Sequence, residues 1–226
     1  MEAMDTDLNL KVNDMSLNRV QHTKCVGVQI DENLTWEQHI DYIINKVVCN
    51  ISLLRKVSSI LTLDNKITIY RSIIEPYFNY CCLVWDGISE TLSMKLQRLQ
   101  NRAARIITGM PYTVRSIEIR NQLGWFSLSE MRKQQKAIMM YKIVNGLAPS
   151  YLADMFISQY GSQIYNLRNS ALNFEIPNTR TELYKDSFAF SGAKIWNSLP
   201  EDLKREQSLS TFKKKIKTIN FCIDNT

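Results

Sequence analysis

LSMKLQRLQNRAARIITGMP, residues 92–111, is the stretch that decides the fold class. At about 100° per residue, its apolar side chains fall within one sector roughly 100° wide, which is typical of an amphipathic helix. Gly109 suits a left-handed helix cap, and Pro111 prevents the helix from continuing. The apolar residues of this sector are Leu92, Leu96, Leu99, Ala103, Ile106 and Ile107.

A neighbouring sector of the same helix, roughly 80° wide, carries only positive charge. A basic stripe of this kind can follow a phosphate backbone, where each contact releases counterions. The alternative is a solvated flank without a ligand. Because the segment contains no acidic residue, we favour nucleic-acid binding. The stripe consists of Lys95, Arg98, Arg102 and Arg105.

The segment SLSEMRKQQKAIMMYKIVNGLAP, residues 127–149, has the same organisation. Ser127 and Glu130 have the spacing of a capping box, and Gly146 can end the helix. This helix offers a second cationic surface. Its members are Arg132, Lys133, Lys136 and Lys142.

Two further helical segments precede residue 92. Thr35 and Gln38 have the spacing of a capping box, and apolar residues then recur at steps of three and four up to Leu54. In the segment 64–85 we expect a helix that is kinked or broken near Glu75-Pro76, because proline cannot donate to the preceding turn.

Strand-like alternation is confined to two regions. Residues 8–12 and 26–30 alternate around a turn at Asn13-Asp14, which predicts a small β-hairpin. Leu172, Phe174 and Ile176 alternate before TRTELYKDSFAF (179–190), which suggests a second hairpin or an extended arm within residues 165–192. LPEDLK (199–204) is typical of a helix start. STFKKKIKTINF (210–221) predicts a short basic helix that is a nuclear address, a nucleic-acid contact or a soluble tail.

These patterns predict a mainly α fold in three parts. They are a small N-terminal β-hairpin in residues 1–34, a helical bundle in 35–146, and a C-terminal α+β extension in 147–226 with a short hairpin and a basic terminal helix. The scarcity of glycine (7) and proline (5) among 226 residues agrees with helices.

The distribution of charge and of apolar residues indicates which class of partner the chain binds. Residues 1–50 hold 4 basic and 8 acidic residues, whereas the remainder holds 24 basic and 14 acidic residues, a net charge of +10. Such a body suits a polyanion, most simply nucleic acid. No apolar run approaches the roughly 20 residues that span a bilayer, so we expect no membrane partner. Because no signal peptide precedes Met1, we expect a chain that is not secreted and whose five cysteines are free thiols.

The sequence lacks the common motifs of catalytic and cofactor-binding sites. The chain has no GxGxxG, P-loop, HExxH or GxSxG motif and no Asp-Asp dipeptide. The cysteines have no metal-ligand spacing, and His39 fits a packed or capping residue better than a catalytic one. We therefore expect no cofactor in this chain and no catalysis by it alone.

KCVGVQIDENLTWEQHI (24–40) resembles the stretch that follows the catalytic palm in reverse transcriptases of jockey-like, non-LTR (LINE) retrotransposons. Cys25-Val26 replaces the usual aromatic-Leu pair, a mild departure. The resemblance covers roughly residues 8–217. Its other blocks are YRSIIEPYFNYCCLVWDG (70–87), KLQRLQNRAARIITG (95–109), LGWFSLSEMRKQQKAIMMYKIVNGLAPSYL (123–152) and RTELYKDSFAFSGAKIWNSLPEDLK (180–204).

The resemblance implies a primer grip in 1–34, a thumb in 35–146 and a C-terminal extension in 147–226. The palm, with its Tyr-x-Asp-Asp motif and Mg²⁺ ions, would lie outside this sequence. A thumb holds RNA–DNA hybrid or duplex by its backbone, without sequence preference. The implied contacts are Lys95, Arg98, Arg102 and Arg105, with Arg132, Lys133 and Lys136 as a second rank. Trp36, Trp85, Trp125 and Trp196 are expected in the core.

Two alternatives stay open. The sequence is a truncated gene product of a complete polymerase, or it is a domesticated helical scaffold that binds the palm or another protein through apolar faces and unpaired strands. A retrotransposon product would work in the cytoplasm, in the nucleus, or in both.

Overall fold

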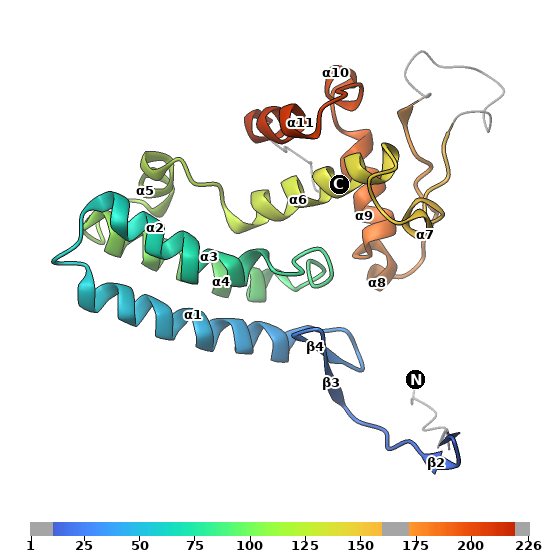
Figure 1. Ribbon diagram of the computed structural model, residues 1–226, viewed down its shortest axis with the longest axis horizontal. Helices are drawn as coiled ribbons and strands as arrows, with labels where there is room; N and C mark the ends of the chain where they lie inside the picture. The colour runs from blue at the N-terminus through green and yellow to red at the C-terminus, as the bar shows by residue number, and fades with distance from the viewer. Residues whose placement is uncertain (1–10, 160–171, 220–226) are drawn as a thin grey trace.

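The chain folds mainly as α-helices, as shown by a computed structural model that describes residues 11–159 and 172–219 (Figure 1). The predicted mainly α class with an N-terminal hairpin is confirmed. The helices are α1 (Glu37–Val57), α2 (Leu63–Ile73), α3 (Glu75–Asn79), α4 (Glu90–Thr108), α5 (Ser116–Leu123), α6 (Leu128–Val144), α7 (Ser150–Ala153), α8 (Glu182–Lys185), α9 (Phe188–Asn197), α10 (Glu201–Lys204), α11 (Leu209–Lys215) and the 3-10 helix η2 (Ile216–Thr218).

Two antiparallel β-hairpins precede the helices, where the sequence predicted one. The predicted turn at Asn13-Asp14 is confirmed, with φ of 49° and 62°. The second hairpin turns at Val26-Gly27, with φ of 46° and 82°. Positive φ at both central residues suits the right-handed twist of hairpin strands. The strands are β1 (Lys11–Val12), β2 (Met15–Ser16), β3 (His22–Cys25) and β4 (Val28–Asp31).

The single strand predicted over residues 26–30 is therefore wrong at its start. Val26 lies in the turn and is 78% exposed, whereas Val28 is buried in the core. Alternation alone missed this turn because Gly27 interrupts the run with a backbone conformation that favours glycine. The hydroxyl of Tyr80 donates to the Val26 carbonyl oxygen at 2.7 Å, which attaches the second hairpin to the helical body. The alternation predicted for residues 8–10 lies outside the described residues.

The join between β4 and α1 is organised by Asp31. Its Oδ1 accepts from the backbone N–H groups of Asn33 and Thr35 at 3.2 and 2.9 Å, and its Oδ2 accepts from that of Trp36 at 2.8 Å. The predicted Thr35–Gln38 capping box is wrong, because α1 begins at Glu37 and its N-cap residue Trp36 has a φ of 64°. The carboxylate of Asp31, which lies four residues before Thr35 and five before Trp36, takes the capping role that was predicted for the Thr35 hydroxyl.

The first core fills the space between α1, α2, α3 and α4. The expected apolar stripe of α1 is buried from Ile40 to Leu54, and Trp36 and Trp85 lie in the same core as expected. The predicted break near Glu75-Pro76 is confirmed, since α2 ends at Ile73 and α3 begins at Glu75. His39 is also buried here, 2% exposed, and its Nδ1 accepts from the Gln29 backbone N–H at 3.4 Å.

The second core lies between α6, α9, α10 and α11 and includes Trp196 and Phe212. Helix α6 belongs to both cores. Leu128, at its start, packs in the first, and residues from Ala137 to Ile143 pack in the second. The predicted Ser127–Glu130 capping box begins this helix, with both of its hydrogen bonds formed. The two cores meet within α6, and not at its end. The division of the chain at residue 146 stays a prediction.

Helices occupy Glu182–Lys185 and the residues from Phe188 onward, so the predicted hairpin or extended arm is wrong for most of the segment 179–190. The segment contains α8 and the start of α9, where the Ser187 hydroxyl accepts from the Phe190 backbone N–H at 3.4 Å. Strand-like pairing does occur just before it. Phe174 forms an isolated antiparallel bridge with Ser158. The remainder of the predicted hairpin, residues 165–171, lies outside the described residues.

The helix start predicted at 199–204 is confirmed by α10. The short basic helix predicted within 210–221 is confirmed by α11 and η2 up to Thr218, and residues 220 and 221 lie outside the described residues. Lys213, Lys214 and Lys215 are exposed on α11. Across 11–159 and 172–219, no helix combines the length and the apolar character needed to cross a bilayer.

A buried ion cluster joins the two cores. Asp86, in the loop before α4, accepts from the Arg132 Nε and pairs through its other oxygen with the Lys136 ammonium. Arg132 also donates to the Ser93 hydroxyl on α4, and Lys136 to the Ser191 hydroxyl on α9, both at 2.8 Å. The carboxylate thus fixes α6 against α4 on one side and α9 on the other.

We expect Asp31→Ala to lower the free energy of unfolding by about 1 kcal/mol, since it removes acceptors at the start of α1. Urea unfolding at neutral pH measures this, with Glu32→Ala, an exposed ion-pair partner, as a control that changes it by less than about 0.5 kcal/mol.

The same pair of proteins tests a pH dependence. Burial opposes ionisation of Asp31, but the N–H groups of Thr35 and Trp36 outweigh it and lower its pKa below the ordinary 3.8. A lowered folded-state pKa stabilises the fold above the ordinary value and loses that contribution as the pH falls through it. The wild-type advantage over Asp31→Ala should therefore shrink below about pH 4. A constant difference would contradict the role of the charge.

We expect Asp86→Asn to cost about 3 kcal/mol or more, because it leaves two buried cations without their counter-ion. Asp41→Asn makes the same chemical change at an exposed site and should cost less than about 0.5 kcal/mol. Equal urea midpoints for the two variants would show that the cluster does not hold the cores together.

Candidate nucleic-acid interface

The predicted basic stripe lies on α4, which is fixed by its opposite face. The Ser89 hydroxyl accepts from the Leu92 backbone N–H at 3.4 Å at the start of the helix. Gly109 ends it with a φ of 72°, as predicted. Leu96, Ala103 and Ile107 are buried in the first core, so the flank that bears the cations faces outward.

Three of the four predicted stripe cations have no partner within the described chain. Lys95 and Arg98 are exposed and Arg102 is half-buried. None of the three forms an ion pair or a hydrogen bond with the residues that the structure describes. From Lys95 to Arg102 the helix rises about 10 Å, so the three charges form a short row. Such a row is free to bind an external anion.

Arg105, the fourth stripe residue, supports the loop that follows α4. Its guanidinium donates to the Val114 carbonyl oxygen at 3.1 Å and to the Ser116 hydroxyl at 2.9 Å. It also lies over the ring of Tyr112, 5.3 Å from the centroid. This side chain is positioned by three contacts, and its charge still lies beside that of Arg102.

The structure adds Arg55, which sequence reasoning missed. Helix α1 packs along α4. At their ends Arg55, Arg102, Arg105 and Tyr112 line a shallow groove of about 200 Å³. Arg55 is exposed, and so is Tyr112, at 82%. The only sequence signal was a cation in the last turn of a helix, and the packing of α1 on α4 was needed to bring it to the stripe.

The predicted second rank is placed differently. Arg132 and Lys136 are each 6% exposed and are held by Asp86 in the buried cluster. The guanidinium of Arg132 also lies 5.8 Å from the Trp85 ring centroid. Lys133 is half-buried and forms no ion pair within the described residues. The structure therefore brings Arg132 and Lys136 together inside the molecule and does not place them with the stripe on α4.

The residues present do not fit the Mg²⁺ that the resemblance implies for the palm. Within the described parts of the chain, no three histidine, cysteine or acidic side chains are grouped so that they could hold a metal ion.

The chain is similar to parts of several polymerases. It is 32% identical over 103 residues to the probable RNA-directed DNA polymerase from transposon X-element of Drosophila melanogaster, which covers 44% of this chain and 11% of that protein. It is 29% identical over 111 residues to the RNA-directed DNA polymerase from mobile element jockey of Drosophila funebris, or 48% of this chain and 12% of that protein. It is 26% identical over 124 residues to the probable RNA-directed DNA polymerase from transposon BS of Drosophila melanogaster. That match covers 54% of this chain and 14% of that protein.

No family model matches the chain, and no solved structure matches it. The matches span only 11–14% of the lengths of these relatives. Over about half of its length, the chain is thus similar to a part of the RNA-directed DNA polymerases of jockey-like, non-LTR retrotransposons.

Proposed function

We propose that this chain binds nucleic acid through the sugar-phosphate backbone, without sequence preference, as a non-catalytic part of an RNA-directed DNA polymerase. The observation that carries the proposal is the row of Lys95, Arg98 and Arg102, three cations without partners among residues 11–159 and 172–219, on a helix whose other face is buried. Similarity to retrotransposon polymerases supports it, since such enzymes must hold a template and primer of any sequence.

The dimensions of the row suit a phosphate backbone. Phosphates on one strand of a duplex follow each other at about 3.4 Å along the axis, so a row about 10 Å long faces roughly three of them. Arg55 and Arg105 extend the positive surface at one end, where Tyr112 offers an exposed ring. Backbone contacts of this kind hold a duplex and carry no sequence information.

Of the predicted second rank, Arg132, Lys133 and Lys136, only Lys133 enters the proposal. For Arg132 and Lys136 to contact phosphate, both would have to leave Asp86 and bring a buried carboxylate toward a polyanion. That exchange is unfavourable, because separating a buried ion pair leaves an uncompensated charge.

The activity of the complete protein is also a proposal. We infer that the palm of a longer chain supplies Mg²⁺ and the acidic residues, whereas residues 1–34 grip the primer and the helices hold the duplex. The protein would then meet its template in the cytoplasm or at chromosomal DNA in the nucleus. Nucleotide incorporation by the purified 226-residue chain would contradict this division.

We expect the triple variant Lys95→Gln/Arg98→Gln/Arg102→Gln to weaken binding to an RNA–DNA hybrid. Each lost phosphate contact should reduce the slope of log K against log salt by about 0.7–0.9. Fluorescence anisotropy with two hybrids of unrelated sequence measures this, and both hybrids should change equally.

The matched control is Lys11→Gln/Lys185→Gln/Arg205→Gln, which removes the same net charge from exposed sites outside α4. We expect it to keep the wild-type slope. If both triple variants behave alike, net charge and not the stripe determines binding. Salt-independent binding by the wild type would refute the phosphate-contact proposal.

A further inference from the structure

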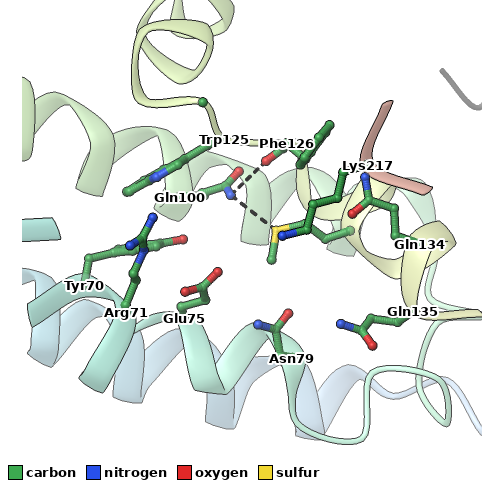
Figure 2. A pocket seen from close by; sticks show the side chains of 12 residues that line it. Tyr70, Arg71, Glu75, Asn79, Gln100, Trp125, Phe126, Gln134, Gln135 and Lys217 are labelled. Atoms are coloured by element: carbon green, nitrogen blue, oxygen red, sulfur yellow. Dashed lines mark hydrogen bonds between the residues drawn. The ribbon is translucent and has the colours of Figure 1, made fainter. Parts of the chain in front are cut away.

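A polar pocket of about 290 Å³ lies on the side of α4 away from the stripe (Figure 2). Its floor is formed by Tyr70, Arg71 and Glu75 on α2 and α3, and Gln100 and Gln134 reach it from α4 and α6. At about 100° per residue, Gln100 lies roughly 180° around α4 from the centre of the stripe. The pocket and the stripe are therefore separate surfaces.

Two buried polar groups of this pocket lack partners. The Tyr70 hydroxyl and the Gln134 Nε2 form no hydrogen bond within the described structure, although these residues are only 2% and 7% exposed. Gln100, beside Tyr70, donates instead to the Phe126 carbonyl oxygen at 3.1 Å. Buried polar groups are nearly always paired, so two orphans in one pocket indicate that a ligand completes them.

The mouth of the pocket carries charges that are not neutralised by contact. Arg71 and Lys217 are exposed, and neither comes within ion-pair distance of an acidic group in the described residues. Figure 2 shows the Glu75 carboxylate between them. Burial raises the pKa of Glu75, and the two cations oppose that rise. The site thus offers two donors for an anion and one carboxylate acceptor.

An aromatic pair completes one wall. The rings of Tyr70 and Trp125 stack with centroids 4.1 Å apart and an interplanar angle of 21°. Tyr70 is buried and Trp125 is half-buried, so Trp125 is the accessible ring of the pair. Aromatic side chains beside amide and carboxylate groups are what proteins use to bind unpaired bases, which stack on the ring and are hydrogen-bonded along their edges. The volume is at the lower end of the range for ligand pockets, so the ligand is small.

We propose that this pocket binds a single unpaired nucleotide whose base carries an exocyclic amino group. The phosphate would lie at Arg71 and Lys217, and the base would lie at the Tyr70–Trp125 wall. Glu75 accepts from the amino group, as acidic side chains do with cytosine. Gln134 and the Tyr70 hydroxyl then gain the partners that they lack. A free phosphate would bind the cations but leave both groups unpaired.

The test is isothermal titration of the purified full chain with cytidine monophosphate, uridine monophosphate and inorganic phosphate. The two nucleotides differ at the position where cytosine has an amino group and uracil a carbonyl oxygen. We expect saturable binding of one equivalent, with cytidine monophosphate preferred about tenfold because one base-edge interaction distinguishes them. Inorganic phosphate should bind more weakly than either.

Two variants separate the parts of the site. Glu75→Gln should abolish or reverse the preference, since an amide can donate to the uracil oxygen. Lys217→Ala, at an exposed side chain, should weaken both nucleotides equally. Arg205→Gln, at an exposed side chain that does not line the pocket, is the control and should change neither affinity. Circular dichroism confirms that each variant is folded.

Several results would overturn the proposal. They are no saturable binding of either nucleotide, an unchanged preference in Glu75→Gln, or inorganic phosphate binding as tightly as cytidine monophosphate, which would indicate an anion site only. None of them bears on duplex binding by the stripe, because the pocket variants leave every stripe residue unchanged and the stripe is tested separately with RNA–DNA hybrids.

Discussion

The buried Asp86 carboxylate is the contact on which the arrangement of the helices depends. It pairs with both Arg132 and Lys136, which lie one turn apart on α6, and through their hydroxyl partners it connects α6 with α4 and α9. Because α6 contributes to both hydrophobic cores, fixing this helix fixes the relation between them. Neither cation would be buried without the acid, since an unpaired charge is strongly disfavoured away from water.

The cluster also explains why two similar basic helices have different roles. On α4 the cations occupy a flank beside the buried face, and Lys95 and Arg98 reach solvent. On α6 the positions of Arg132 and Lys136 are buried, so both cations pair with Asp86 inside the molecule. The proposed duplex-binding surface is consequently smaller than the sequence suggested, and Arg55 from a different helix extends it.

Sequence reasoning succeeded where the signal is local. The Gly109 end of α4, the Ser127–Glu130 capping box and the break before Pro76 each depend on a few neighbouring residues. It failed where a partner is distant or where two local signals compete. Asp86 is 46 residues from Arg132, and the Tyr70–Gln134 pocket forms only when α2 and α6 approach each other. The alternation of Leu172, Phe174 and Ile176 favoured a hairpin or an extended arm that continued through 179–190, whereas the Ser187 cap and the packing of α9 on α6 made a helix there.

We infer that the exposure of the basic side chains, and not their number, decides which of them contact nucleic acid. Lysine acetylation footprinting with mass spectrometry, in the absence and presence of an RNA–DNA hybrid, tests it directly. We expect Lys95 to react in the free protein and to be protected by the hybrid, and Lys136 to be unreactive in both. Rapid labelling of Lys136 that the hybrid suppresses, with Lys95 unaffected, would contradict the account.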